Sequence, residues 1–151
     1  MITYRTPVLE EWVDYNGHLR DAFYLLIFSY ATDAFMAAVG IDPARDQRSL
    51  FTLECHLNYL HEVKLGAEVQ VCTHIVASDH KRVHLYHSLH VPGSDQPVAA
   101  SEQMLLHVDL AGPRAAAFDT TVLDKLATFS SHQAALPATA FIGRIINLPQ
   151  R

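Results

Sequence analysis

The chain has 151 residues and a mass of 16.9 kDa, and 50% of its residues are hydrophobic. This is enough for one packed core and too little for two ordinary domains, so a single domain spanning residues 1–151 is predicted. Acidic residues outnumber Lys and Arg by 16 to 11. The resulting net charge of −5 excludes the basic footprint of a nucleic-acid-binding protein, and no nucleic-acid partner is expected.

Cysteine usage and the N-terminal sequence bear on where the protein resides. Cys55 and Cys72 lie in strand-like apolar segments, and a chain of this size needs no disulfide to supplement its core. Residues 1–7 lack the charged and apolar regions of a secretion signal. The most apolar window, residues 22–40, is interrupted by polar residues and by Asp33. We therefore expect a cytoplasmic protein with no membrane contact.

The first half of the chain predicts one strand and one long helix. Residues 2–13 alternate weakly between apolar and polar side chains, which predicts a strand that the turn-rich residues 14–17 end. A helix is predicted from Asp21 to Val39, with Gly40 as its C-terminal cap. Its apolar residues lie on nearly every side, so this helix should be enclosed by the rest of the fold on most sides.

Four strand-like segments follow the helix, at Phe51–Tyr59, Glu68–Ala77, Arg82–Val91 and Val98–Leu110. Short turns join them and predict an antiparallel meander. Residues 119–135 predict a second, amphipathic helix, and the tail from 138 to 151 is left unassigned. This order of elements predicts an α+β fold in which a curled antiparallel sheet wraps a long central helix.

The segment from Asp14 to Tyr24 reads DYNGHLRDAFY. It resembles the loop-to-helix signature D-x-x-G-H-V-N-N-x-x-Y of the hotdog-fold acyl-CoA thioesterases, members of the 4-hydroxybenzoyl-CoA thioesterase-like superfamily. Asp, Gly, His and Tyr are in register, and the resemblance extends in order over residues 3–110. The sequence departs from the signature at Arg20 and Asp21, where the family commonly has two asparagines. Any role of those side-chain amides in holding the loop is therefore in doubt for this chain.

A longer match narrows the resemblance. Residues 12–19 and 28–33 are similar to the betainyl-CoA thioesterases of carnitine catabolism, a branch of the same fold. The resemblance implies a hotdog fold, hydrolysis of a short acyl-CoA thioester such as betainyl-CoA to betaine and free CoA, and no cofactor. It also implies a homodimer or homotetramer in which two sheets pair edge to edge with the pocket between them. An unpaired edge strand would in addition promote aggregation.

Thioester hydrolysis needs a carboxylate that attacks the carbonyl carbon or deprotonates a water, and backbone donors for the oxyanion. Asp14 is the candidate for the first role. The resemblance suggests the backbone amide of Asp21 for the second, at the positive end of the predicted helix. His18 is a candidate to polarise the carbonyl or to orient Asp14. The alternative is that Asp14 and Asn16 only form a turn, that His18 is an ordinary loop residue, and that Asp21 only caps the helix.

A betainyl group carries a trimethylammonium, which has no hydrogen-bond donor, so its site should consist of aromatic faces and a nearby carboxylate. The candidate substrate-binding residues are aromatic residues, two residues of the motif and one acidic residue: Trp12, Tyr15, Asn16, Gly17, Tyr30, Glu54 and Tyr59. Packing in the core or at a dimer interface is the alternative role of each aromatic residue. Glu54 lies on the opposite strand face from Tyr59, where it meets solvent, a second chain or the cationic substrate.

The chain has ten histidines, and His84, His87 and His90 share one predicted strand. A rise of about 3.3 Å per residue separates His84 from His90 by roughly 20 Å and turns His87 to the other face. One zinc ion cannot reach all three, so no metal site is predicted and these histidines are expected at the surface or at an interface. Lys64 and Arg82 are candidates for binding the CoA phosphates, with solvated surface charge as the alternative.

Three other functions stay open at the level of sequence. The first is hydrolysis of thioesters of plain medium or long acyl chains. The second is a hotdog lyase (dehydratase) in which a histidine shuttles the proton, and the third is a ligand-binding hotdog module without activity. A carboxylate in the loop ahead of the helix favours hydrolysis over the lyase, and the presence of Asp14 counts against the inactive module.

Overall fold

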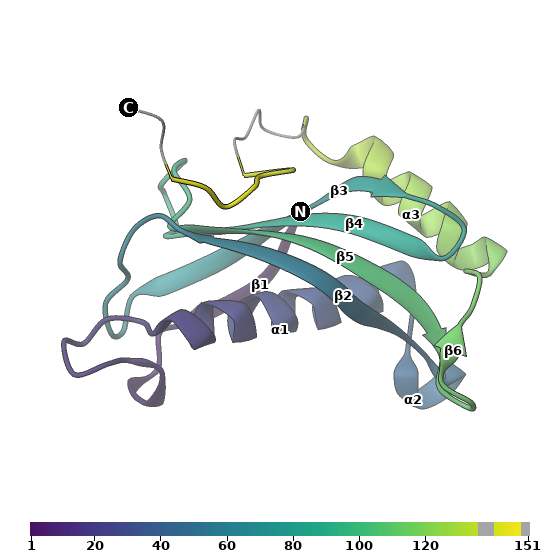
Figure 1. Cartoon of the computed structure of the whole chain (residues 1–151), viewed down its shortest axis with the longest axis horizontal. Coiled ribbons are helices and arrows are strands. Elements are labelled where there is room, and N and C mark those ends of the chain that lie inside the picture. Colours follow the sequence, from purple (N-terminus) through teal and green to yellow (C-terminus); the bar gives the residue numbers. More distant parts are fainter. Residues whose placement is uncertain (136–140, 149–151) are drawn as a thin grey trace.

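The structure of the chain, a computed structural model, describes residues 1–135 and 141–148. An antiparallel sheet of six strands curls around one long helix (Figure 1), so the predicted α+β architecture is confirmed. The strands are β1 (Ile2–Pro7), β2 (Arg48–Tyr59), β3 (Glu68–Ser78), β4 (Arg82–His90), β5 (Ala99–Asp109) and β6 (Arg114–Ala115). The helices are α1 (Asp21–Val39), the short α2 (Pro43–Asp46) and α3 (Thr120–His132), with a 3₁₀ turn η1 at Glu10–Trp12.

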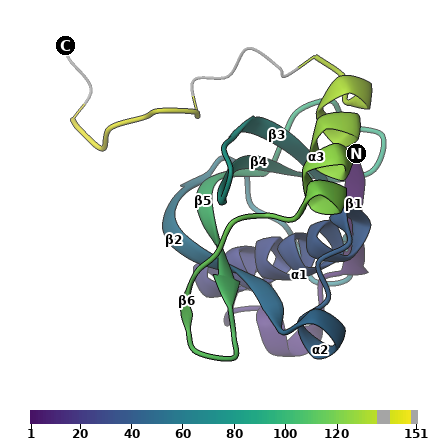
Figure 2. The same ribbon diagram turned by 90° about the vertical axis from the view of Figure 1, so that its right-hand side faces the viewer.

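Helix α1 lies in the hollow of the sheet and has the predicted bounds (Figure 2). Arg20 precedes it in an extended conformation, and Gly40 ends it in the left-handed region with a φ of 86°. A residue other than glycine is strained at that φ. The sheet-facing side chains of α1 form the core, and four of them are fully buried: Ile27, Phe28, Ala31 and Phe35. Burying each of the three larger ones contributes about 2 kcal/mol.

The burial of α1 is one-sided. Leu25 is 44% exposed and Tyr30 is 38% exposed, and Asp33 is also exposed on the side away from the sheet. The expectation that the helix is enclosed on most sides is therefore wrong for a single chain. By length and composition alone α1 could cross a membrane, but in this fold its buried side chains fill the hollow of the sheet.

The order of strands in the sheet is β1-β3-β4-β5-β2, with β6 beside β5. The expected four-stranded meander is correct for β3, β4 and β5 but wrong for β2, which pairs with β5 at the far edge. The reason is that the segment after β2 is no hairpin. The backbone N–H groups of Leu60 and His61 donate to the Val98 carbonyl, and the chain then crosses the end of the sheet to begin β3.

A chain of buried polar side chains crosses the core between the sheet and α1. His87, which is fully buried, stacks on Phe28, and its two ring nitrogens lie 2.8 Å from Thr73 Oγ1 and 3.2 Å from Thr32 Oγ1. Thr32 also contacts the Gln103 side chain. The expectation that the strand histidines lie at a surface or interface is thus wrong for His87, because these hydroxyl partners satisfy a ring that the core encloses.

Helix α3 packs beside the C-terminal half of α1: Phe129 meets Phe35 edge to face with ring centroids 5.3 Å apart, and Val122 and Leu126 belong to the same buried cluster. The Asp119 side chain caps the first turn of α3, and the Gln133 side chain after the helix bonds both backbone groups of Ile75. The pairing with Ile75 ends α3 three residues before the predicted Ala135. Residues 141–148 cross the outer face of the sheet, where the Gly143 N–H donates to Glu102 (Figure 1).

The burial of His87 makes stability depend on pH. Burial lowers the pKa of His87 from its ordinary 6.5 to about 3, whereas the unfolded chain takes up this proton near pH 6.5. Protons therefore favour the unfolded state, and the stability is lost as the pH falls from 6.5 towards 3. We expect this residue alone to lower the free energy of unfolding by about 1.4 kcal/mol per pH unit in that window.

Urea unfolding at pH 7 and pH 5 measures this effect. The variant His87→Gln should be less stable than the wild type at pH 7 and lose about 2 kcal/mol less between the two pH values. The exposed His132 serves as the control, since His132→Gln should keep the wild-type dependence. An unchanged pH dependence in His87→Gln would show that the buried ring does not couple folding to protons.

Candidate functional site

The motif begins with a tight loop that Asp14 holds together. Its Oδ1 accepts hydrogen bonds from the backbone N–H groups of Asn16 (2.8 Å) and His18 (3.1 Å), and its own N–H donates to the His18 carbonyl. The hydrogen bond from His18, with that from Asn16, lowers the pKa of Asp14 below its ordinary 3.8. Asp14 therefore carries a negative charge near neutral pH, and among the described residues its second oxygen has no hydrogen-bond donor.

A second segment clamps this loop in place. Leu19 donates its N–H to the Val63 carbonyl, Leu65 donates to the Gly17 carbonyl, and His18 pairs with Lys64 as an isolated bridge. Gly17 turns the chain with a φ of +74°, which favours glycine. The pairing brings the predicted phosphate-binding Lys64 beside the motif, where it is exposed.

The loop leads directly into the N-terminus of α1, where backbone N–H groups lack an acceptor within the helix. The Asp21 N–H is the first of the helix, and the carbonyl four residues earlier, that of Gly17, is already bonded to Leu65. Arg20 provides no side-chain cap, and the Asp21 carboxylate accepts from the N–H of Ala22 instead. Within the described part of the chain the Asp21 amide is therefore unengaged, and the helix dipole adds a partial positive charge there.

A cavity of about 280 Å³ opens at this end of the helix, and we term it the α1 cavity. It is lined by Leu19, Asp21, Tyr24, Tyr59, Leu60, His61 and Glu62. The rings of Tyr24 and Tyr59 meet edge to face with their centroids 5.3 Å apart. The Tyr59 hydroxyl donates to the Asp21 carbonyl, and the Tyr24 hydroxyl donates to that of His61. The cavity thus joins the start of α1 to the end of β2.

The ionisation of both phenols reflects their surroundings. Burial raises the pKa of Tyr24 above its ordinary 10, and the Glu62 carboxylate adds to that shift. Burial also raises the pKa of Tyr59, with the Asp21 carboxylate acting in the same direction. Both phenols are therefore neutral hydrogen-bond donors at neutral pH, and the charges that line the cavity are those of the two carboxylates.

Of the predicted substrate-binding residues, the structure places Tyr59 in the α1 cavity and four others outside its lining. Trp12 is buried and stacks on Phe23 at 6.0 Å, so it belongs to the core. Tyr15 stands at the tip of the loop and is 94% exposed. Asn16 and Gly17 form the turn itself.

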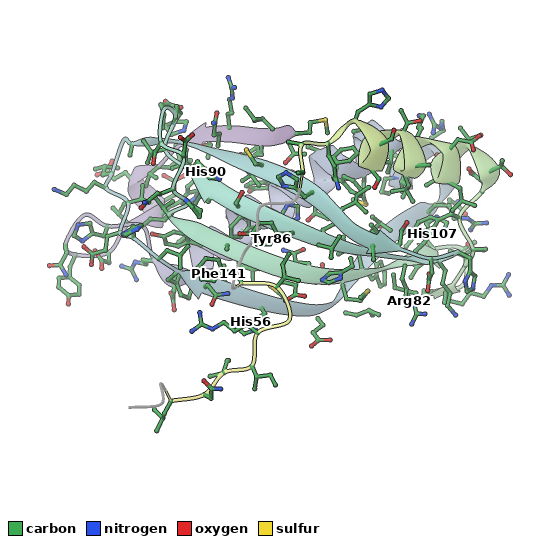
Figure 3. The ribbon with its side chains drawn as sticks, turned by 90° about the horizontal axis from the view of Figure 1, so that it is seen from above. His56, Arg82, Tyr86, His90, His107 and Phe141 are labelled. Carbon is green, nitrogen blue, oxygen red and sulfur yellow. The ribbon has the colours of Figure 1, made fainter. Side chains whose placement is uncertain are left out.

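Tyr30 and the charged candidates lie elsewhere. Tyr30 packs on Tyr4 of β1 at 5.3 Å. Glu54 lines a separate cavity on the outer face of the sheet with His56 and Glu102. Arg82 pairs with Asp79 through two hydrogen bonds, at the opposite end of β4 from His90 (Figure 3). Because the α1 cavity adjoins the other end of the sheet, Arg82 lies away from it within one chain.

His18 contributes its backbone to the Asp14 turn, while its ring lies 3.6 Å from the Glu62 carboxylate. Sequence reasoning missed Glu62 and Tyr24 as residues of the site. Tyr24 could have been found from the sequence, because it is the last residue of the Asp14–Tyr24 motif and matches the tyrosine of the signature. Glu62 could not, because only the pairing of two loops brings it to the helix.

The arrangement supplies the groups that acyl transfer to water requires. The ionised Asp14 carboxylate sits in the turn that also carries Leu19 of the cavity wall, although neither Asp14 nor His18 lines the cavity itself. Asp21, whose helix-terminal N–H is unengaged, is a lining residue. A larger cavity of about 440 Å³ lies at the other end of α1, near Gly40, without any residue of the motif. Among the described residues, no group of three or more His, Cys, Asp or Glu side chains could hold a metal ion.

Comparison with known proteins gives one consistent family. The thioesterase-like superfamily model matches residues 8–126. The chain is 59% identical to betainyl-CoA thioesterase of Pseudomonas aeruginosa, and the match covers 99% of this chain and 96% of that protein. It is 35% identical to L-carnitine dehydrogenase/betainyl-CoA thioesterase of Rhizobium meliloti over 92% of this chain, which corresponds to only 28% of that longer protein.

Solved structures agree with the sequence comparison. A thioesterase from Pseudomonas putida superposes with a TM-score of 0.91 at 57% identity, covering 99% of this chain and 97% of that one. A protein from Staphylococcus aureus, solved in complex with CoA, superposes with a TM-score of 0.90 at 27% identity, covering 99% and 96%.

Proposed function

The chain belongs to the thioesterase-like superfamily and hydrolyses acyl-CoA thioesters, and on that basis we propose that its substrate is betainyl-CoA, cleaved to betaine and free CoA. The observation that carries the substrate is the 59% identity to a betainyl-CoA thioesterase along nearly the whole of both chains. The hydrolase family also favours this chemistry over the lyase and the inactive module.

In the proposed mechanism the Asp14 carboxylate starts the reaction. As a general base it takes a proton from a water whose oxygen attacks the thioester carbonyl carbon; as a nucleophile it attacks that carbon itself, and water then hydrolyses the acyl-carboxylate anhydride. Either route breaks the carbon–sulfur bond, and the CoA thiolate takes up a proton. The hydrogen bonds from Asn16 and His18 support both routes, because they fix the carboxylate and keep it ionised.

The carbonyl oxygen becomes negative in the transition state and needs a donor. We assign this role to the Asp21 N–H, which has no competing acceptor among the described residues and lies at the positive end of α1. Lys64, exposed beside the motif, supports binding of a CoA phosphate at the mouth of the site.

We further propose that the protein is a homodimer or homotetramer joined through β2. This strand pairs with β5 on one side, and no described strand covers its other side. Two large apolar residues of β2 stay about half exposed in the single chain: Phe51 (46%) and Leu53 (57%). An uncovered edge of this kind pairs readily with a second strand.

Removal of the Asp14 charge should abolish hydrolysis while keeping the loop. In Asp14→Asn the amide oxygen still accepts from Asn16 and His18, so only the charge and the nucleophile are lost. We expect kcat for betainyl-CoA to fall by about a hundredfold or more, measured as free thiol release, with an unchanged thermal midpoint. Wild-type turnover in this variant would remove Asp14 from the mechanism. In the wild type, preference for acetyl-, butyryl- or long-chain CoA would reject betainyl-CoA as the substrate.

A pair of substitutions at position 21 tests the contribution of the Asp21 backbone N–H to catalysis. Asp21→Pro and Asp21→Ala both lack the carboxylate, but only the proline lacks the N–H. Proline is tolerated at the first position of a helix, and the extended backbone of Arg20 suits a residue that precedes proline. We expect kcat of Asp21→Pro to be about a hundredfold lower than that of Asp21→Ala. Equal values in two folded variants would place the oxyanion elsewhere.

A charge on the edge of β2 should dissociate the assembly. By light scattering during gel filtration, the wild type should have at least twice the chain mass of 16.9 kDa, and Leu53→Arg should return it to that of one chain. The matched control is Leu123→Arg on the exposed side of α3, where the wild-type leucine is 38% exposed. A wild type that is already monomeric contradicts the proposal.

A further inference from the structure

We propose that the α1 cavity is the subsite for a quaternary ammonium group on the acyl chain, formed by the ring of Tyr59 and the carboxylates of Glu62 and Asp21. This inference rests on the proposed function and deepens it, because it assigns the part of the substrate that the catalytic groups do not touch. Three features support it: the Tyr59 ring is held in place and open to the cavity, the cavity wall is acidic, and the cavity adjoins the proposed oxyanion donor.

Tyr59 presents an aromatic surface that is fixed and open. Its ring is held by the edge-to-face contact with Tyr24 and by the hydrogen bond from its hydroxyl to the Asp21 carbonyl. Tyr24 is only 4% exposed and supports the ring from the core side, whereas Tyr59 is 53% exposed and lines the cavity. A trimethylammonium has no N–H to donate, so attraction to the negative face of a ring is its main means of recognition.

The charge of the cavity wall suits a cation. Two of the seven lining residues, Asp21 and Glu62, are acidic, and none is Lys or Arg. His61 is the one histidine of the lining; outside it, the His18 ring lies 3.6 Å from Glu62, and Lys64 follows in the clamping segment. An alkyl chain would gain nothing from two carboxylates, while a fixed positive charge is stabilised by both.

The position of the cavity matches the length of a betainyl group. A single methylene separates the ammonium nitrogen of betaine from the carbonyl carbon, so the cation subsite must adjoin the oxyanion donor. Asp21 meets this requirement, since it lines the cavity and also supplies the unengaged N–H. Trp12 in the core and Glu54 on the outer face do not.

A pair of isosteric substrates tests the charge alone. Betainyl-CoA and tert-butylacetyl-CoA have the same shape and differ in having nitrogen or carbon at the branch point, so the ratio of their kcat/KM values measures recognition of the charge. The wild type should favour betainyl-CoA by roughly tenfold or more. Glu62→Gln and Tyr59→Leu should each lower this ratio several-fold, because each should reduce kcat/KM more for betainyl-CoA than for tert-butylacetyl-CoA.

Two further variants separate the charge effect from other causes. Tyr59→Phe keeps the ring and removes the hydroxyl, so it should retain most of the preference. Asp124→Asn removes an exposed carboxylate from α3 and should leave the ratio at the wild-type value. The far-UV circular dichroism spectrum and the thermal midpoint report that each variant is folded.

The outcomes distinguish this inference from the proposed function. If the wild type hydrolyses both isosteres equally well, thioester hydrolysis stands and the cation subsite is overturned. If Tyr59→Leu or Glu62→Gln lowers hydrolysis of both substrates by the same factor, the residue positions the acyl group without sensing its charge, and the inference also fails. No hydrolysis of either substrate by the wild type would instead overturn betainyl-CoA as the substrate.

Discussion

Burial of α1 in the hollow of the curled sheet is the constraint on which the rest of the structure depends. Phe28, Ala31 and Phe35 have no exposed surface, so the helix cannot slide or turn without opening the core. The first amides of any helix lack internal acceptors, and they are available for chemistry wherever that end emerges. Packing of the helix therefore decides where the site lies, and the loop before the helix decides which groups meet there.

The motif shows how one carboxylate can serve structure and chemistry together. Oδ1 of Asp14 is committed to the turn through Asn16 and His18, and these same hydrogen bonds hold the group in its ionised form. The turn-forming role of Asp14 and the catalytic role that we propose for it are therefore compatible. The pairing of Leu19 with Val63 then fixes the whole turn against the segment after β2, which ties the loop to the cavity wall.

The single chain leaves two apolar surfaces open, the outer side of α1 and the free edge of β2. Leu25 and Tyr30 represent the first, and Phe51 and Leu53 the second. Tyr59 belongs to β2 and also to the α1 cavity, so the edge strand and the substrate site share a residue. Any partner that pairs with β2 would therefore change the surroundings of the cavity, so the assembly that we propose would be coupled to substrate recognition.

The sequence by itself determined the bounds of α1, the fold class and the motif from Asp14 to Tyr24, because helix caps, hydrophobic period and turn residues are encoded locally. Only the tertiary structure decided that β2 lies beside β5, that His87 is enclosed by the core, and that Glu62 stands at the start of α1. Those features depend on contacts between segments distant in the chain. Neither the hydrophobic period nor the residue spacing of one strand identifies the distant residues that will pack against that strand.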